Sequence, residues 1–260
     1  MCPTIRKRYK LCDWININQL DWTNLSLNPN AAELLEKHLD KVDWRLMSLN
    51  PGIISILERN LDKVYWENIC ANPNAIGIIE RNLDKADWTQ LSMNPNAVHL
   101  LEQYFDKIDW WCIAFNPNAI HIIEKNLDKI CWDNLAKNPN AVHLIEHNLF
   151  NLSKKGWDFL SKNPNAIHLI ELYPHKINWF SLAQNPNALH IIDSNIDKID
   201  ITYLSSNPNA VYIPYIVSNC ENAEWRYISK HPRSINFIRA NLDLVCWKSL
   251  SCNPAIFEEV

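Results

Sequence analysis

The sequence predicts an all-α solenoid, a stack of repeated helix pairs, and three observations predict it. An Asn-Pro pair recurs throughout the 260 residues, and its first six copies are spaced by 22. A Trp stands six residues before this pair in ten of eleven copies. Gly occurs only 3 times, so Asn and Pro must make the turns. We number copies 1 to 11 by the residue before Pro: Asn28, Asn50, Asn72, Asn94, Asn116, Asn138, Asn163, Asn185, Asn207, His231 and Asn253.

Each copy predicts a first short helix that begins at the Pro, which we call the Pro-led helix. In copy 5 it covers roughly residues 117–126, because Pro suits the first turn of a helix. Asn116 or Asn118 is expected to cap it. Ala119, Ile120 and Ile123 share one apolar face.

A second short helix, the Trp-led helix, is expected after a turn. In copy 6 it contains Trp132 and Leu135 and ends near Asn138, because the following Pro disfavours α conformation there. Asp128 or its equivalents are expected to cap it. Helices of two to three turns are unstable alone, so they must pack against neighbouring copies.

Three repeated residues are expected to hold the stack together. The Trp rings should be buried as wedges between copies, although an aromatic ladder for bases or sugars is the rival interpretation; they include Trp44, Trp66, Trp88, Trp110 and Trp132. The position four residues after the Trp is always small, which lets helices approach closely. Asn94, Asn116 and Asn138 should bond the backbone of the next copy through both ends of the amide.

The chain divides into a capping segment at 1–20 and the repeats at 21–260. Terminal copies of a solenoid need a cap, and 1–20 resembles a degenerate half-repeat. The copies are irregular at 149–156, where three residues are added, and at 201–220. In the second stretch Ile201 replaces the Trp and Pro214 falls inside the Pro-led helix, so a bend is expected.

Composition excludes several classes of protein. The net charge of −4, with interspersed acids and bases, argues against a surface that binds nucleic acid. None of the 8 Cys forms a Cys-x-x-Cys pair, which predicts buried, reduced thiols and an intracellular protein. The N-terminus lacks the apolar core of a signal peptide, and no apolar run is long enough for a membrane span.

The block from Asn116 through Trp132, Asn-Pro-Asn-Ala-Ile-His-Ile-Ile-Glu-Lys-Asn-Leu-Asp-Lys-Ile-Cys-Trp, resembles the Asn-Pro-Asn-Ala short repeats of giant DNA virus proteins. That resemblance covers about residues 20–260 and implies a paralogous repeat family without an established activity. Residues 135–139 and 144–145 are also similar, more weakly, to leucine-rich variant repeats. That family implies alternating α and 3₁₀ helices in a right-handed superhelix. One member of that family carries an iron–sulfur cluster on an N-terminal group of Cys residues. Such a cluster is not expected here, because only Cys2 and Cys12 lie near the N-terminus.

The candidate site is a row of side chains at one position of the repeat, where the residue type varies from copy to copy while the rest of the repeat stays the same. It consists of His99, His121, His143, His168 and His190, and the irregular stretch adds Tyr203, Tyr212 and Tyr215. A solvent-exposed row that binds a partner is one interpretation, and drift of a surface position is the other. The His positions are expected to bind no metal, because neighbouring helices lie about 9–10 Å apart.

A second row, of Glu, is expected to be an exposed face rather than a pair of catalytic carboxylates. General acid–base catalysis needs groups in different environments, and repeated residues share one environment. The row comprises Glu36, Glu58, Glu80, Glu102, Glu124, Glu146 and Glu171.

The sequence therefore favours a non-catalytic scaffold that binds an unidentified protein, without a cofactor. The resemblance further implies that the protein is a structural or host-interaction protein of a large virus, located in the host cytoplasm or the virion. The alternative is a helical-repeat nucleic-acid binder, which needs a basic face. An enzyme is not expected, because no phosphate loop, nucleophile motif or zinc signature occurs.

Overall fold

The computed structural model describes residues 8–209 and 225–260, which are mostly helical. Many short helices follow one another at a period of about 22 residues, so this part of the prediction is confirmed. The chain forms two compact units. Unit 1 comprises Met1–Ile78 with Asn222–Val260, and unit 2 comprises Ile79–Glu221.

Unit 1 combines both ends of the described chain. Its Trp-led helices are α1 (Trp22–Leu25), α3 (Trp44–Leu49), α5 (Trp66–Ala71), α18 (Trp225–Lys230) and α20 (Trp247–Leu250). Its Pro-led helices are α2 (Ala32–Glu36), α4 (Ile54–Glu58) and α19 (Ile235–Arg239), and α6 (Ile76–Glu80) spans the boundary between the units. Short elements complete it: β1 (Tyr9–Leu11), η1 (Ile17–Gln19), η10 (Pro232–Ser234), η11 (Pro254–Ile256) and β2 (Phe257–Glu259).

Unit 2 contains the regular middle of the chain. Its Trp-led helices are α7 (Trp88–Met93), α10 (Trp132–Leu135), α12 (Lys154–Lys162), α14 (Trp179–Leu182) and α16 (Ile201–Leu204), and η4 (Ile113–Phe115) takes this place in copy 5. Its Pro-led helices are α8 (Val98–Gln103), α9 (Ile120–Glu124), α11 (Val142–Glu146), α13 (Ile167–Leu172) and α15 (Leu189–Asp193). The 3₁₀ turns η2 (Leu83–Lys85), η3 (Phe105–Lys107), η5 (Pro139–Ala141), η6 (Leu149–Asn151), η7 (Pro174–Lys176) and η8 (Ile196–Lys198) join them.

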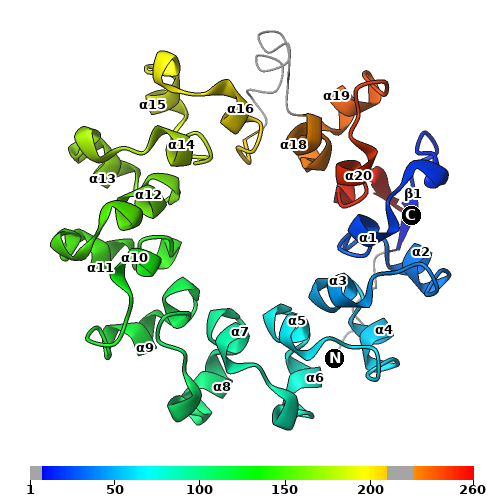
Figure 1. Ribbon diagram of the computed structural model, residues 1–260, viewed down its shortest axis with the longest axis horizontal. Helices are drawn as coiled ribbons and strands as arrows, with labels where there is room; N and C mark the ends of the chain where they lie inside the picture. The colour runs from blue at the N-terminus through cyan, green and yellow to red at the C-terminus, as the bar shows by residue number, and fades with distance from the viewer. Residues whose placement is uncertain (1–7, 210–224) are drawn as a thin grey trace. The chain divides into compact units, whose positions relative to one another are not determined.

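The two kinds of helix form two rows, and the core lies between them. Within unit 2, the Trp-led helices follow the concave side of the arc and the Pro-led helices the convex side (Figure 1). The third residue after the Trp is fully buried, as at Leu91, Ile113 and Leu135, and so is the Ala that precedes each Pro-led helix of unit 2. Each helix therefore contributes a few apolar side chains, and adjacent copies complete the burial.

The buried Asn before each Pro joins one copy to the preceding copy. The side-chain nitrogen of Asn138 donates to the carbonyl oxygens of Ala114 and Asn116, both at 3.0 Å. Its Oδ1 accepts from the backbone N–H of Asn140 in its own copy at 3.0 Å. The expectation that both ends of the amide reach a neighbouring copy is therefore corrected, since only the nitrogen does so. We call this repeated arrangement the Asn ladder.

The ladder is kept in copy 9, and copy 10 keeps the cap within the copy, although the sequences of both are irregular. Asn207, in the copy that lacks the Trp, still donates to the carbonyl oxygens of Ala183 and Asn185. In copy 10, Nδ1 of His231 replaces the Asn oxygen and accepts from the N–H of Arg233 at 3.2 Å. The bend expected at 201–220 concerns residues 210–220, including Pro214, which lie outside the described residues.

The small residue of the Trp-led helix makes a second link where it is Ser. Oγ of Ser161 donates to the carbonyl of Trp157 and accepts from the N–H of Asn178 in the next copy at 3.1 Å. Ser26, Ser48, Ser92 and Ser229 also accept from the next copy. The small residue thus permits close approach and, as Ser, also satisfies a backbone donor.

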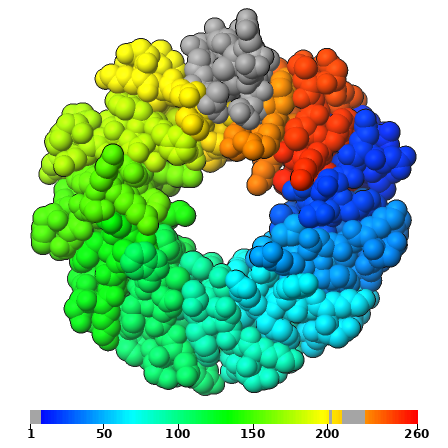
Figure 2. Space-filling view, viewed as in Figure 1, coloured from blue at the N-terminus to red at the C-terminus, as the bar shows by residue number. Residues whose placement is uncertain are grey.

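In the Asn ladder, copy 1 bonds to copy 11 in the way that other copies bond to the copy before them. Asn28 donates to the carbonyl oxygens of Ser251 and Asn253, and the N–H of Asp21 donates to Oγ of Ser251. Strands β1 and β2 pair antiparallel beside this contact, and Figure 2 shows the blue N-terminal copy against the red C-terminal copy. Residues 1–20 were expected to cap copy 1. The bonds of copy 1 on that side go instead to copy 11. The strand pair is a feature that the all-α prediction lacked.

The recurrent Trp rings are half-buried, so the expectation of buried wedges is corrected. Trp44, Trp66, Trp88, Trp110 and Trp132 all retain exposed surface, whereas Trp157 is buried. The ammonium group of a Lys in the following turn lies over several of the rings. Lys63 lies 5.0 Å from the centroid of Trp44, and Lys129 lies 4.7 Å from that of Trp110. One ring face thus packs on the copy, and a cation covers other ring surface.

The helix caps also differ from the prediction. The residue immediately before the Trp caps the Trp-led helix where its side chain can accept, as Asp43 and Asp87 do. In copy 6 this residue is Cys131, which makes no such bond, and Asp128 is not the cap. The Asn before Pro caps the 3₁₀ turn that precedes the Pro-led helix, as Asn138 does for η5, and the helix proper begins after Ala141.

Candidate interaction surface

The expected His row lies on the Pro-led helices of unit 2, where four of its members bond to the preceding copy. His99, His121 and His190 place Nε2 at 2.8 Å from Oε1 of Glu80, Glu102 and Glu171, and His143 lies 3.1 Å from Glu124. Each side chain is about half exposed. A carboxylate can only accept, so these pairs require the tautomer with a proton on Nε2.

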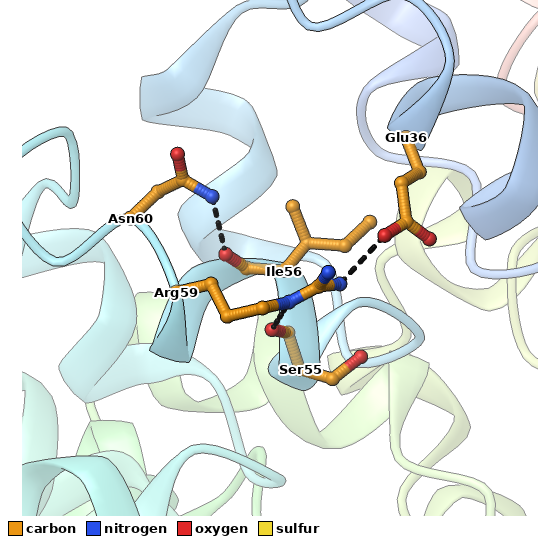
Figure 3. A network of polar contacts seen from close by, with 5 residues as sticks. All are labelled: Glu36, Ser55, Ile56, Arg59 and Asn60. Carbon is orange, nitrogen blue, oxygen red and sulfur yellow. Dashed lines mark hydrogen bonds and ion pairs between the residues drawn. The ribbon is translucent and has the colours of Figure 1, made fainter.

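Unit 1 makes the same link with a different residue. Ser55 takes the position of the His, and Arg59, one turn later, donates from Nη2 to Oε1 of Glu36 at 2.7 Å. Nε of Arg59 also donates to the carbonyl of Ser55 (Figure 3). Because a different donor reaches the same Glu position, the row is explained by the joining of copies. The bonds between copies therefore explain the His residues, and no binding partner is needed to account for them.

The other predicted site residues are dispersed. His168 is exposed at the same repeat position on α13. Tyr203 lies on α16, and its ring packs edge-on against Phe180 at 4.2 Å between centroids. Tyr212 and Tyr215 lie outside the described residues. Within residues 8–209 and 225–260, no group of three or more His, Cys, Asp or Glu could hold a metal ion.

A different surface gathers exposed aromatic and basic side chains on the Trp-led side of unit 2. We call it the aromatic–lysine strip. Trp111 is 57% exposed and Phe180 is 50% exposed, although large apolar side chains usually bury most of their area. The strip runs through copies 5 to 9 and comprises Trp111, Phe115, Lys137, Lys155, Phe159, Lys162, Phe180 and Tyr203.

Contacts within the strip join its copies. The Lys155 ammonium lies 5.9 Å from the Trp111 ring and 5.5 Å from the Phe159 ring. Lys137 lies 5.3 Å from the Phe115 ring of the preceding copy. Such cation–π contacts contribute about 0.5–1 kcal/mol at exposed sites. They orient the lysines without neutralising their charge.

The irregular stretch at 149–156 supplies part of this strip. Its added residues extend α12 to nine residues, and Lys155, Phe159 and Lys162 fall on one face at helical spacing. Ser153 caps the helix and bonds through its N–H and Oγ to Asp133 of copy 6. At Gly156 an added Cβ would lie 2.3 Å from Oδ1 of Asp133. Glycine thus lets the added turn lie against the preceding copy.

The strip carries three lysines, and two aspartates lie beside it. Asp133 and Asp158, the acids beside it, already accept hydrogen bonds, from Ser153 and from the side chain of Asn178. Lys162 donates to Gln184 at 2.8 Å. Burial, and then the charge of Lys137, lower the pKa of Lys162. Two ammonium groups that repel one another in this way would be stabilised by an anionic group between them.

Cysteine chemistry is not favoured by the described thiols. Cys70 and Cys112 are buried, Cys12, Cys131, Cys246 and Cys252 are half-buried, and all six are free. Burial, with a further contribution from the Asp109 carboxylate, raises the pKa of Cys112 to about 11. A thiol with such a pKa is protonated at neutral pH and is a poor nucleophile. Cys2 and Cys220 lie outside the described residues.

Comparison of the chain with protein-family models, with curated proteins and with solved structures finds no match. Among the described helices, none has the length and apolar character required to cross a membrane. The interpretation of the surface therefore depends on the geometry above.

Sequence reasoning missed the strip although a signal for it exists. Its aromatic residues occur at positions one, two and five after the Trp, which hold other residues in most copies; Trp111, for example, stands where copy 4 has Thr89. The variable His position on the Pro-led helix is the more conspicuous signal in the sequence. The contact between Lys155 and Trp111 depends on how α12 lies on copy 6, which repeat spacing alone does not indicate.

Proposed function

We propose that this protein is a non-catalytic repeat scaffold that binds a protein partner along the aromatic–lysine strip. The observation that carries the proposal is the half-exposure of Trp111 and Phe180 at positions that vary within a fixed frame. Tyr, Trp and Phe are enriched at protein interfaces. The concave side of a solenoid is also where repeat proteins place extended binding surfaces.

The strip is favoured over the His row for a physical reason. His99, His121, His143 and His190 already bond to a carboxylate of the preceding copy, so a partner would have to compete with these pairs. Lys137 and Lys155 instead lie over aromatic rings and keep their charge. A scaffold role also agrees with the repetition of one structural frame through the chain.

Three finer expectations remain part of this proposal. The resemblance to giant DNA virus repeats supports a structural or host-interaction protein of such a virus, located in the host cytoplasm or the virion. The similarity to leucine-rich variant repeats supports a right-handed stack. The nucleic-acid-binding alternative is disfavoured by the net charge of −4, but the lysines of the strip keep it as an outcome to be tested.

A peptide-display selection on the immobilised full chain tests the proposal. We expect strip-dependent enrichment, lost in Trp111→Ala/Phe180→Ala and retained in His121→Ala/His143→Ala, which serves as the matched control. Circular dichroism should show that both variants stay folded. Enrichment that depends on the His residues, or no enrichment at all, would contradict the assignment of the binding surface.

A further inference from the structure

We propose that the partner of the strip is an extended acidic segment of a protein, about a dozen residues long. This inference rests on the proposed function and specifies the chemistry of the partner. Its basis is the alternation of cations and exposed rings along successive copies: Trp111, then Lys137, then Lys155 and Lys162, then Phe180 with Tyr203.

The charge of the strip indicates acidic side chains. Lys137 and Lys155 lie over aromatic rings of the strip, and Lys162 donates to Gln184 at 2.8 Å. Burial, and then the charge of Lys137, lower the pKa of Lys162, while Asp133 and Asp158 each accept hydrogen bonds. A carboxylate between these ammonium groups would offset their repulsion and accept their hydrogen bonds. A basic or neutral segment would leave the repulsion in place.

The rings indicate that the segment also carries apolar side chains. Phe180 and Tyr203 pack edge-on at 4.2 Å, and half of Phe180 remains exposed. Trp111 is more exposed still, and Lys155 approaches it at 5.9 Å. Leu, Ile or aromatic side chains of a partner would bury these surfaces, while the acidic side chains between them reach the lysines.

The spacing of copies indicates an extended conformation. Packed helices lie about 8–10 Å apart, so the four steps from copy 5 to copy 9 cover roughly 32–40 Å. An extended chain advances about 3.3 Å per residue, which corresponds to about twelve residues. Roughly every third residue of the segment would then meet a new copy. A single α-helix of twelve residues is about 18 Å long and would cover half of this distance.

A protein segment fits the strip better than single-stranded nucleic acid does. Nucleic acid presents one phosphate per nucleotide, and its binding surfaces need many cations along a basic groove. Here three lysines serve five copies, and two acids lie beside them. A protein segment can match this sparse pattern because its acidic residues can be spaced.

The test uses a display library of random twelve-residue peptides, sorted by net charge, on the full chain. We expect enrichment of peptides with negative charge and apolar residues. Fluorescence anisotropy of the most enriched peptide should show binding roughly tenfold weaker to Lys137→Gln/Lys155→Gln/Lys162→Gln, since each exposed charge pair contributes modestly. Lys85→Gln/Lys107→Gln/Lys129→Gln, which removes the same charge elsewhere in unit 2, should bind as the wild type does.

The outcomes separate this inference from the proposed function. Neutral or basic peptides that still require Trp111 and Phe180 would overturn the acidic partner and retain a protein-binding strip. No strip-dependent peptide, together with tight binding of a twelve-nucleotide oligouridine, would overturn both. Binding of acidic peptides that is unchanged in the triple Lys→Gln variant would also overturn the inference.

Discussion

At the scale of single residues, the buried Asn before Pro carries most of the specificity of the stack. One side chain satisfies two backbone carbonyls of the preceding copy and one N–H of its own copy. These groups are buried, so removing the amide would take one hydrogen-bond donor from each carbonyl. No apolar residue of similar size can do this, because the site needs two donors and one acceptor in fixed directions.

We predict that Asn138→Ala lowers the free energy of unfolding by about 2–4 kcal/mol, because two buried carbonyls each lose a hydrogen-bond donor. The control is Asn140→Ala, whose side chain makes one exposed bond to the carbonyl of Pro117 and should cost less than about 1 kcal/mol. Urea denaturation measures both. Equal losses in the two variants would count against the ladder as the main link.

The Trp rings differ in burial, and their substitution should differ accordingly. Trp157→Ala, at a buried ring, should cost about 3–5 kcal/mol. Trp44→Ala and Trp88→Ala, at half-buried rings, should cost about 1–3 kcal/mol, because less apolar area is lost from the fold. Denaturant midpoints at constant slope measure the difference, and equal costs would mean that ring burial does not control the contribution.

At the scale of elements, repeat spacing determines the fold well and the contacts between copies less well. The Pro and Trp positions predicted where short helices occur, because φ restriction and apolar periodicity are local properties. The cap before Trp44, Asp43, was missed because the Asp of the turn is the more regular residue of the repeat. The half-burial of the Trp and the pairing of β1 with β2 depend on contacts distant in sequence.

The extension of α12 yields a prediction at this scale. Gly156→Ala should lower stability by about 1–3 kcal/mol, because its Cβ would clash with Asp133 and the added turn would shift. The double variant Asp133→Ala/Gly156→Ala should lose less than the sum of the two single variants, since the clashing carboxylate is gone. Additive losses in thermal denaturation would show that Asp133 does not limit the approach of α12.

At the scale of the whole molecule, the two ends of the described chain belong to one unit. Copy 11 offers its carbonyl oxygens to Asn28 as copy 5 does to Asn138, and β1 pairs with β2 beside this contact. Residues more than 220 positions apart thus make contacts that elsewhere join neighbours in sequence. Such contacts add a loop-closure cost that the local links between other copies do not have.

The most direct test of this account compares Asn28→Ala with Asn138→Ala by urea denaturation of the full chain. If copy 11 serves as the preceding copy of copy 1, both substitutions remove two donors from buried carbonyls and should lower stability by a similar amount, about 2–4 kcal/mol. If copy 1 instead ended the stack, Asn28 would face solvent, and Asn28→Ala would leave the stability nearly unchanged. That second result would contradict the account.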